Sequence, residues 1–125
     1  MTQSVVLLFG LAEEPAQVLT DALRAAGVRA HRVPDSHLGL RISEILARKA
    51  PAAPYDGEAL AESMAVLHNL GNKGLDAALA AMRASGVSLG LKAITTPVNL
   101  YWTPIALQRS LLSERAAIEQ ARRKQ

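Results

Sequence analysis

The sequence contains no cysteine, which excludes a disulfide framework and thiolate chemistry. Aromatic residues are also scarce, since the chain has one Trp, one Phe and two Tyr. Few side chains are therefore available for stacking on nucleic-acid bases. The longest apolar run, VVLLFGLA at 5–12, is interrupted by Gly10 and is far shorter than a membrane span. No basic segment precedes this run, so we expect no secretory signal and a soluble cytoplasmic protein.

What is present is ordinary globular composition in a short chain. The protein has 125 residues, of which half are hydrophobic and a fifth are charged. This length and this balance favour one small domain with one core over a disordered chain. The net charge is +3, and much of the excess lies in the last residues, ARRKQ. A basic end of this kind is usually only solvated, so it gives weak support to nucleic-acid binding.

The chain matches itself when it is shifted by 59 positions, so that 4–28 falls on 63–87 without a gap. Apolar character agrees at most of the aligned positions, and eight pairs are identical: Ser4/Ser63, Leu8/Leu67, Leu11/Leu70, Ala22/Ala81, Arg24/Arg83, Ala25/Ala84, Gly27/Gly86 and Val28/Val87. This self-similarity indicates an internal duplication. We predict a single domain, 1–125, built from two repeats at about 4–49 and 63–118. A linker at 50–62 joins the repeats, and a basic tail at 119–125 follows them.

Each repeat begins with the same pattern of elements. A continuous apolar run, Val5–Phe9 or Met64–His68, predicts a strand that is buried on both faces. A helix follows and ends at Gly27 or Gly86, where glycine accepts a left-handed conformation. Its apolar positions have helical spacing in both repeats: Val18, Leu19, Ala22, Leu23 and Ala26 in the first, and Leu75, Ala78, Leu79 and Met82 in the second. Second strands are predicted at 28–33 and 87–94.

A second helix is expected to close each repeat. In the first repeat it covers 36–49 and is capped by Asp35 or Ser36. In the second it starts at Thr103, a good N-cap, with Pro104 at the first helical position. The inward stripe of this last helix is predicted to be Leu107, Leu111 and Ile118. A short helical turn at 58–62 is expected before the third strand.

The order of elements is therefore βαβα–βαβα, which predicts an α/β (α+β) fold. A crossover through a helix makes two strands parallel, so each repeat supplies a parallel pair. The two pairs most simply join into one four-stranded mixed sheet packed with helices, ferredoxin-like or related. The first strand of each repeat is the most hydrophobic, so we place these two strands at the centre. A sheet of this size leaves two edges, and both a monomer and a homodimer stay open.

The segment KAITTPVNLYWT, 92–103, holds the most varied chemistry in the chain. Pro97 cannot donate a backbone hydrogen bond, so strand pairing should stop there, and Thr96 before it should be extended. Asn99 suits a turn, and Trp102 could fold back onto the helix that follows. Strand end, turn, anchor and cap together form a complete structural interpretation of this loop.

The same loop resembles a small uncharacterised bacterial domain family, a domain of unknown function with the motif K-A-x-x-T-P-x-N-x-x-W. The residues that carry the resemblance are Lys92, Ala93, Thr96, Pro97, Asn99 and Trp102. The resemblance covers the second half of the chain, about 63–118, and it implies a fold and a conspicuous loop but no activity. The first repeat departs from it, because HRVPDSHLG keeps Pro34 but has no tryptophan or asparagine.

A functional interpretation of the loop competes with the structural one. Ligands of open α/β sheets bind beyond the carboxyl ends of the strands, where this loop should lie. Its ligand-binding candidates, which could hold a carboxylate or a phosphate, are Lys92, Thr95, Thr96, Asn99 and Trp102. The structural interpretation is favoured, because cap and turn chemistry already accounts for these residue types.

Other candidate sites have less support. The segment Gly71-Asn72-Lys73-Gly74 lacks the spacing of a nucleotide-binding loop, and we expect a helix-initiating turn there. The three histidines, His31, His37 and His68, form no metal-binding pair, so no metal site is assigned. The carboxylates of Glu13 and Glu14 are expected at a helix N-terminus in any case. No catalytic residue or cofactor can be assigned.

The leading hypothesis is a non-enzymatic module that binds a small ligand or a protein partner through the 92–103 loop. The first alternative is a nucleic-acid-binding module, for which the basic candidates are Arg41, Arg48, Lys49, Arg122, Arg123 and Lys124. The second alternative is an enzyme with its site at the same loop. It ranks last, because Lys92 is the only titratable residue near Trp102 besides Tyr101. No membrane partner is expected.

Overall fold

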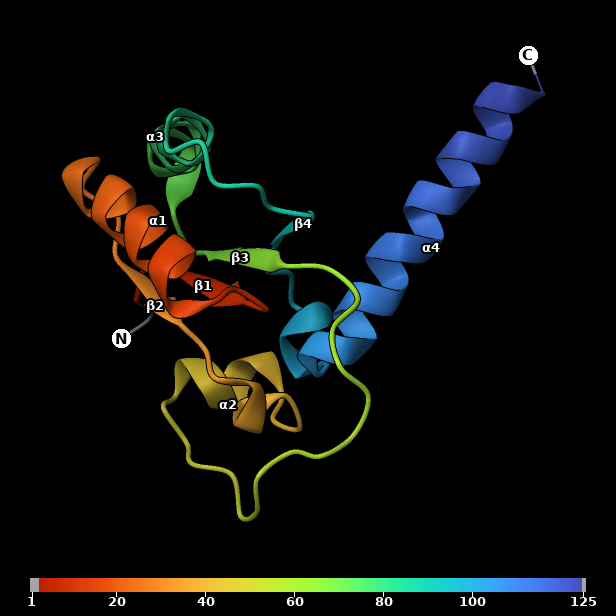
Figure 1. Ribbon diagram of the computed structural model, residues 1–125, viewed down its shortest axis with the longest axis horizontal. Helices are drawn as coiled ribbons and strands as arrows, with labels where there is room; N and C mark the ends of the chain where they lie inside the picture. Colours follow the sequence, from red (N-terminus) through yellow and green to blue (C-terminus); the bar gives the residue numbers. More distant parts are fainter. Residues whose placement is uncertain (1–2, 125) are drawn as a thin grey trace. The chain divides into compact units, whose positions relative to one another are not determined.

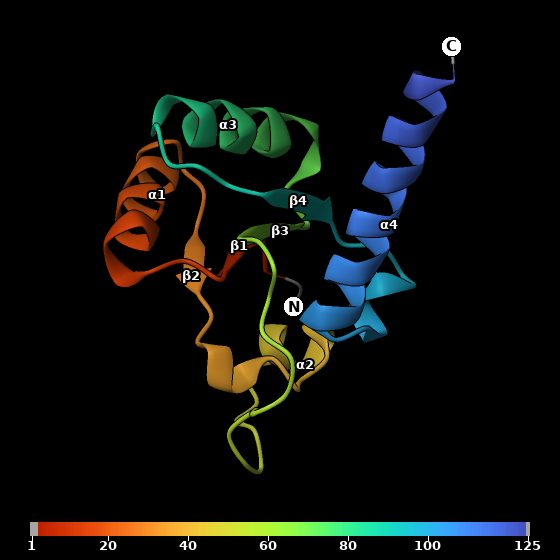
Figure 2. The ribbon, with the colours of Figure 1, turned by 45° about the vertical axis from the view of Figure 1, so that its right-hand side comes forward.

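A computed structural model describes residues 3–124 of the chain (Figures 1 and 2). The elements in order are β1 (Val5–Phe9), α1 (Glu13–Ala25), β2 (Ala30–Arg32), η1 (Asp35–His37), α2 (Ile42–Leu46), β3 (Met64–His68), α3 (Gly71–Ala84), β4 (Leu91–Ile94), η2 (Asn99–Tyr101) and α4 (Pro104–Arg123). The chain divides into two compact units. Unit 1 comprises the residues up to Asp35 together with Ala61–Thr95, and unit 2 comprises Ser36–Leu60 and the residues from Thr96 onward.

Unit 1 contains one four-stranded mixed sheet with the strand order β2-β1-β3-β4. The pairs β1–β2 and β3–β4 are parallel, and β1 and β3 are antiparallel. The register pairs Leu7 with Val66 and Val5 with His68. All residues of β1 and of β3 are buried, as expected for the two central strands. The predicted α/β (α+β) class, the mixed sheet and the central position of the two first strands are therefore confirmed.

Helices α1 and α3 pack together over one face of this sheet (Figures 1 and 2). Their apolar faces and alternate residues of the strands form a single buried cluster: Val6, Leu8, Leu19, Leu23, Val28, Ala30, Ala65, Leu67, Ala78 and Met82. The predicted face of α1 was partly wrong. Ala16 is buried, whereas Val18 is 43% exposed and Ala26 is exposed at the C-cap. The inward positions Ala16, Leu19 and Leu23 follow a spacing of three and four, and Val18 lies beside that stripe.

The backbone repeats the duplication that the sequence indicates. The residue directly after the first strand of each repeat has a left-handed conformation, with φ of 70° at Gly10 and 56° at Asn69. The glycines that end the two helices also agree, with φ of 80° at Gly27 and 76° at Gly86. Each pair is separated by the 59 positions of the sequence shift. The two repeats therefore share these two left-handed positions as well as their apolar pattern.

The second strands are shorter than predicted. At the start of the predicted 28–33 strand, the Val28 N–H donates to the Leu23 carbonyl at 2.8 Å and so still belongs to the helix exit. In the second repeat, pairing cannot begin before Leu91, because β3 itself begins at Met64, the partner of Leu91. Just before it, the Gly90 N–H donates to the side chain of Ser63 at 3.0 Å. The start of β4 is therefore set by the start of the neighbouring β3 rather than by local hydrophobicity.

The predicted helix at 36–49 was wrong in extent, because it is broken into η1 and the short α2. The Leu40 N–H donates to the His37 carbonyl and closes a turn after η1. The helix then restarts after Arg41, whose N–H donates to the Glu44 carboxylate at 2.9 Å. The left-handed residue Arg48, with φ of 59°, follows its end. The short helix expected at 58–62 is absent from the described residues.

The last helix of unit 2 begins as the sequence predicts. The Thr103 side chain accepts a hydrogen bond from the Ala106 N–H at 3.2 Å, and Pro104 occupies the first turn. Leu107 is buried and Leu111 is half-buried, but Ile118 is 56% exposed. The predicted inward stripe was therefore wrong at Ile118, because every described residue from Ser113 onward is exposed.

Candidate functional site

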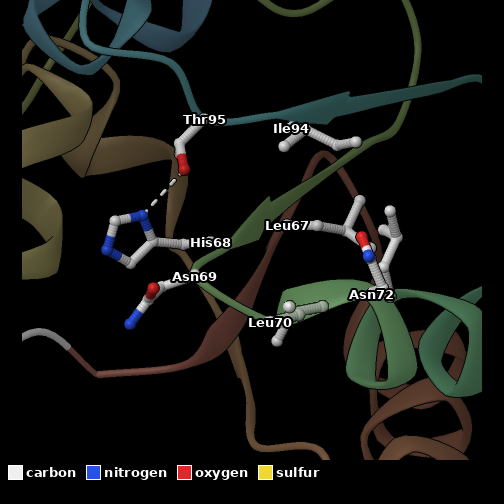
Figure 3. A pocket seen from close by; sticks show the side chains of 9 residues that line it. Leu67, His68, Asn69, Leu70, Asn72, Ile94 and Thr95 are labelled. Carbon is white, nitrogen blue, oxygen red and sulfur yellow. Dashed lines mark hydrogen bonds between the residues drawn. The ribbon is translucent and has the colours of Figure 1, made fainter.

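A pocket of about 420 Å³ opens at the carboxyl ends of β3 and β4 in unit 1 (Figure 3). It is lined by Leu67, His68, Asn69, Leu70, Gly71, Asn72, Leu75, Ile94 and Thr95. Because β3 and β4 are parallel, their carboxyl ends meet at one edge of the sheet. Ligands of open α/β sheets bind at this kind of edge. The fold thus provides a concave surface where ligand sites commonly lie.

The end of each strand supplies one half of a hydrogen-bonded pair. The Thr95 N–H donates to the Leu67 carbonyl at 3.0 Å, which continues the β3–β4 pairing beyond Ile94. This register places the Thr95 hydroxyl 2.8 Å from Nδ1 of His68 (Figure 3). The hydroxyl can donate to Nδ1 or accept from it, depending on the imidazole tautomer. Two residues 27 positions apart in the sequence therefore form one polar unit at the pocket.

His68 is a buried residue, with 7% of its surface exposed. Burial lowers the pKa of His68 below its ordinary value of 6.5, because desolvation disfavours the charged imidazolium. The ring is therefore mainly neutral at pH 7. A neutral imidazole offers one donor and one acceptor, so the polar unit carries no formal charge.

The turn from β3 to α3 forms the floor of the site and contains two left-handed residues. Asn69 has φ of 56° and Gly71 has φ of 70°. The Ser4 hydroxyl donates to the Asn69 carbonyl at 2.6 Å and ties this turn to the segment before β1. A left-handed conformation costs free energy for any residue except glycine, and asparagine tolerates it better than most. The structure accepts this cost at a residue whose side chain lines the pocket (Figure 3).

The rest of the wall is aliphatic. Leu67, Leu70 and Leu75 belong to or border the buried cluster of unit 1, and Ile94 at the rim is 54% exposed. The helix that starts at Gly71 has no side-chain cap, and its first turn has no acidic residue. The predicted helix-initiating turn at 71–74 is confirmed, because these residues form the first turn of α3.

The structure separates the roles of the five predicted ligand-binding residues. Thr95 lines the pocket, whereas Lys92 is an exposed residue of β4 that does not line it. Thr96 and Asn99 bond to each other, since the Thr96 N–H donates to Asn99 Oδ1 at 2.8 Å and the Asn99 N–H donates to Thr96 Oγ1 at 2.9 Å. Trp102 is half-buried, and its carbonyl accepts the Ile42 N–H at 2.9 Å within unit 2. The turn chemistry predicted for this loop is thus present, and the anchor role of the Trp102 ring stays a prediction.

Sequence reasoning missed the central residues of the pocket. It considered His68 only as a metal ligand and did not consider Asn69 at all. The signal was available in the repeat alignment, because His68 and Asn69 fall on Phe9 and Gly10 of the first repeat. Polar residues stand where the duplicated copy has an apolar residue and a glycine.

The other candidate chemistry is sparse within residues 3–124. No group of three or more His, Asp or Glu side chains in this part of the chain could hold a metal ion. His37 lies beside Ser36, with 3.1 Å between Nδ1 and the hydroxyl.

The formal charge is unevenly divided between the two units. Unit 2 has eight of the fourteen Lys and Arg residues and five of the eleven acidic residues, so it carries the whole formal excess of +3.

Comparison with protein-family models, with curated proteins and with solved structures gives no match for this chain. The resemblance of the 92–102 motif to a family of unknown function therefore stays a prediction. Over the described range 3–124, no helix has both the length and the apolar character needed to cross a bilayer.

Proposed function

We propose that the protein is a non-enzymatic cytoplasmic module that binds a small ligand in the pocket of unit 1. The observation that carries this proposal is the hydrogen-bonded pair of buried His68 and half-buried Thr95 at the carboxyl ends of two parallel strands. Thr95 comes from the 92–103 loop, which the leading hypothesis from the sequence names as the binding segment. The cytoplasmic location rests on the sequence features that led us to expect it.

Packing alone does not favour these residues. A buried polar side chain is costly unless it is hydrogen-bonded, and the pair with Thr95 offsets that cost without adding an apolar contact. The equivalent residue Phe9 is fully buried and needs no partner. An apolar residue at position 68 would therefore fill the core without needing a hydrogen-bond partner.

Binding is favoured over catalysis by the composition of the pocket. A histidine that acts as the general base for a nucleophile is usually oriented by a third group, most often a carboxylate. Among the described residues that line the pocket, none is acidic. The His68–Thr95 pair thus resembles a hydrogen-bonding surface for a ligand more than a set of reacting groups.

A thermal-shift screen of small molecules tests the proposal. Hits should raise the unfolding temperature of the wild-type protein, because a ligand that binds the folded state stabilises it by mass action. The variant Asn72→Trp fills the pocket from an exposed position on α3, and it should lose the hits. Asp76→Trp is the matched control, since Asp76 is exposed on the same helix and does not line the pocket. Hits that survive in both variants would place the site elsewhere.

A nucleic-acid-binding function is the second candidate, and the charge of unit 2 favours it. Arg122, Arg123 and Lys124 are exposed at the end of α4, and Arg41, Arg48 and Lys49 are exposed around α2. Basic residues at a helix C-terminus also complement the helix dipole, so their presence does not require a partner.

Fluorescence anisotropy with a single-stranded oligonucleotide distinguishes these two explanations. A nucleic-acid module should bind with an affinity that falls steeply with salt, and glutamine at 122, 123 and 124 should weaken binding. Glutamine at Arg24, Arg29 and Arg83 of unit 1 is the matched control. Binding that is absent, insensitive to salt or equally weakened in both variants would contradict the candidate function.

A further inference from the structure

The duplication supplies an internal control for the pocket. The last residue of the first strand of each repeat and the residue after it are Phe9-Gly10 in one repeat and His68-Asn69 in the other. Phe9 is fully buried, and Gly10 has the left-handed conformation that Asn69 also adopts. The backbone is therefore left-handed at the same position of both repeats, and the two side chains there differ.

Both differences make the second site less favourable for folding. His68 replaces an aromatic hydrocarbon in a buried strand and requires Thr95 as a partner. Asn69 replaces glycine at φ of 56°, where a side chain is strained. Both side chains line one pocket. Residues that oppose local folding preferences on adjacent positions of one cavity indicate a role other than folding.

The polar groups of the pocket define the chemistry of a ligand. The amides of Asn69 and Asn72 can each donate and accept hydrogen bonds, and the neutral His68 ring keeps one role at Nε2, donor or acceptor, because Nδ1 is paired with Thr95. Among the described lining residues none carries a formal charge, apart from the titratable His68. Lys73 and Lys92 are exposed and do not line the pocket. An ion placed in such a site would lose hydration without gaining a counter-charge, so an uncharged head group is favoured.

The apolar wall and the volume define the body of the ligand. Figure 3 shows Leu67, Leu70 and Ile94 on one side of the end of β3 and His68, Asn69 and Thr95 on the other, and Leu75 adds to the aliphatic lining. A volume of about 420 Å³ lies at the small end of the range for small-molecule sites. A compact molecule with one branched aliphatic body fits this surface and this volume.

We propose that the pocket binds an uncharged small molecule with an aliphatic body and one amide-like head group, and that His68 and Asn69 recognise the head. This inference rests on the proposed ligand-binding function. The head group both donates and accepts hydrogen bonds. The His68 imidazole and the Asn69 amide together offer it a donor and an acceptor. Charged ligands of the same shape bind less well.

The test compares 4-methylpentanamide with 4-methylpentanoate, which share one body and differ in the charge of the head. Each is titrated into ¹⁵N-labelled wild-type protein at pH 7.5 and followed by the backbone amide signals of Asn69, Gly71 and Asn72. The amide should shift these signals to saturation, with a dissociation constant about tenfold lower than that of the acid. Tighter binding of the acid would overturn the uncharged head. If neither compound shifts these signals, the ligand class is wrong, while hits from the thermal-shift screen would still support a binding module.

The variant Asn69→Gly tests the recognition residue without a loss of fold, because glycine occupies the same conformation at Gly10. It should weaken binding of 4-methylpentanamide by about tenfold, which corresponds to about 1.4 kcal/mol. Gly10→Asn is the matched control, since it places the same side chain at the equivalent turn of the other repeat, and it should leave the affinity unchanged. Wild-type affinity in Asn69→Gly would overturn the role of Asn69.

Discussion

Nδ1 of His68 lies 2.8 Å from Oγ1 of Thr95, across the carboxyl ends of two parallel strands. This single contact links the buried imidazole of β3 to the 92–103 loop. It also explains how a histidine is accommodated in a strand whose residues are all buried.

Replacement of Thr95 by Val should destabilise the protein by about 1–3 kcal/mol, because it leaves the buried Nδ1 of His68 without its partner. The free energy of unfolding in urea measures the change. Thr20→Val is the matched control, since the Thr20 hydroxyl donates to the Ala16 carbonyl within α1 and its loss leaves no buried group unpaired. Equal, small effects of the two substitutions would show that the His68–Thr95 contact contributes nothing.

The stability of the fold should depend on pH through His68. Burial lowers the pKa of His68 in the folded state, so the unfolded chain binds its proton at a higher pH than the folded chain does. Its contribution to stability is therefore fully present above about pH 6.5 and is lost as the pH falls from there toward the lower, folded-state pKa. Urea unfolding of wild type and His68→Phe between pH 5 and 8 isolates this effect from that of His31 and His37. A stability difference between the two proteins that stays constant over this range would contradict the prediction.

The two helix-ending glycines should respond alike to substitution. Gly27 and Gly86 have φ of 80° and 76°, and an added Cβ at either position would meet no atom within 4 Å. Alanine should therefore cost only backbone strain, about 1–2 kcal/mol at each position, and asparagine should cost less because it tolerates the left-handed region. Thermal unfolding of the four single variants checks the pairwise agreement. Unchanged stability in both alanine variants would show that these turns can adopt another conformation.

Thr96 and Asn99 of the 92–103 loop should contribute to the stability of the fold as one hydrogen-bonded unit. Thr96 and Asn99 exchange two hydrogen bonds between side chain and backbone, and Asn99 is only 8% exposed. A double-mutant cycle with Thr96→Val and Asn99→Ala should give a coupling free energy of about 0.5–3 kcal/mol. Thr96→Ser keeps the hydroxyl and should stay close to wild type. Strictly additive effects in the cycle would remove the evidence for this structural role.

The elements that local chemistry determines could be predicted from the sequence. The strands of Val5–Phe9 and Met64–His68 are continuous apolar runs, and Thr103 before Pro104 specifies the start of α4 without reference to the rest of the chain. The duplication placed Gly27 and Gly86 in equivalent turns. These features depend on a few adjacent residues, so pattern and propensity suffice.

The features that tertiary contacts determine could not be predicted. The second strand of the second repeat is short because pairing begins only where the partner strand begins, as at Met64 and Leu91. Ile118 keeps the period of a buried stripe but lies in a fully exposed part of α4. The pocket was missed because it depends on the register that brings Thr95 beside His68, two residues that no sequence motif connects.

Ligand binding in the pocket at the ends of β3 and β4 is the property on which the proposed function depends most. The most direct measurement is a ¹H–¹⁵N correlation spectrum of the assigned protein, recorded with and without the strongest hit of the thermal-shift screen. If the pocket binds the compound, the amide signals that shift should cluster at His68, Asn69, Gly71, Asn72 and Thr95. Perturbations that map instead to α2 or α4, with these five amides unchanged, would contradict it.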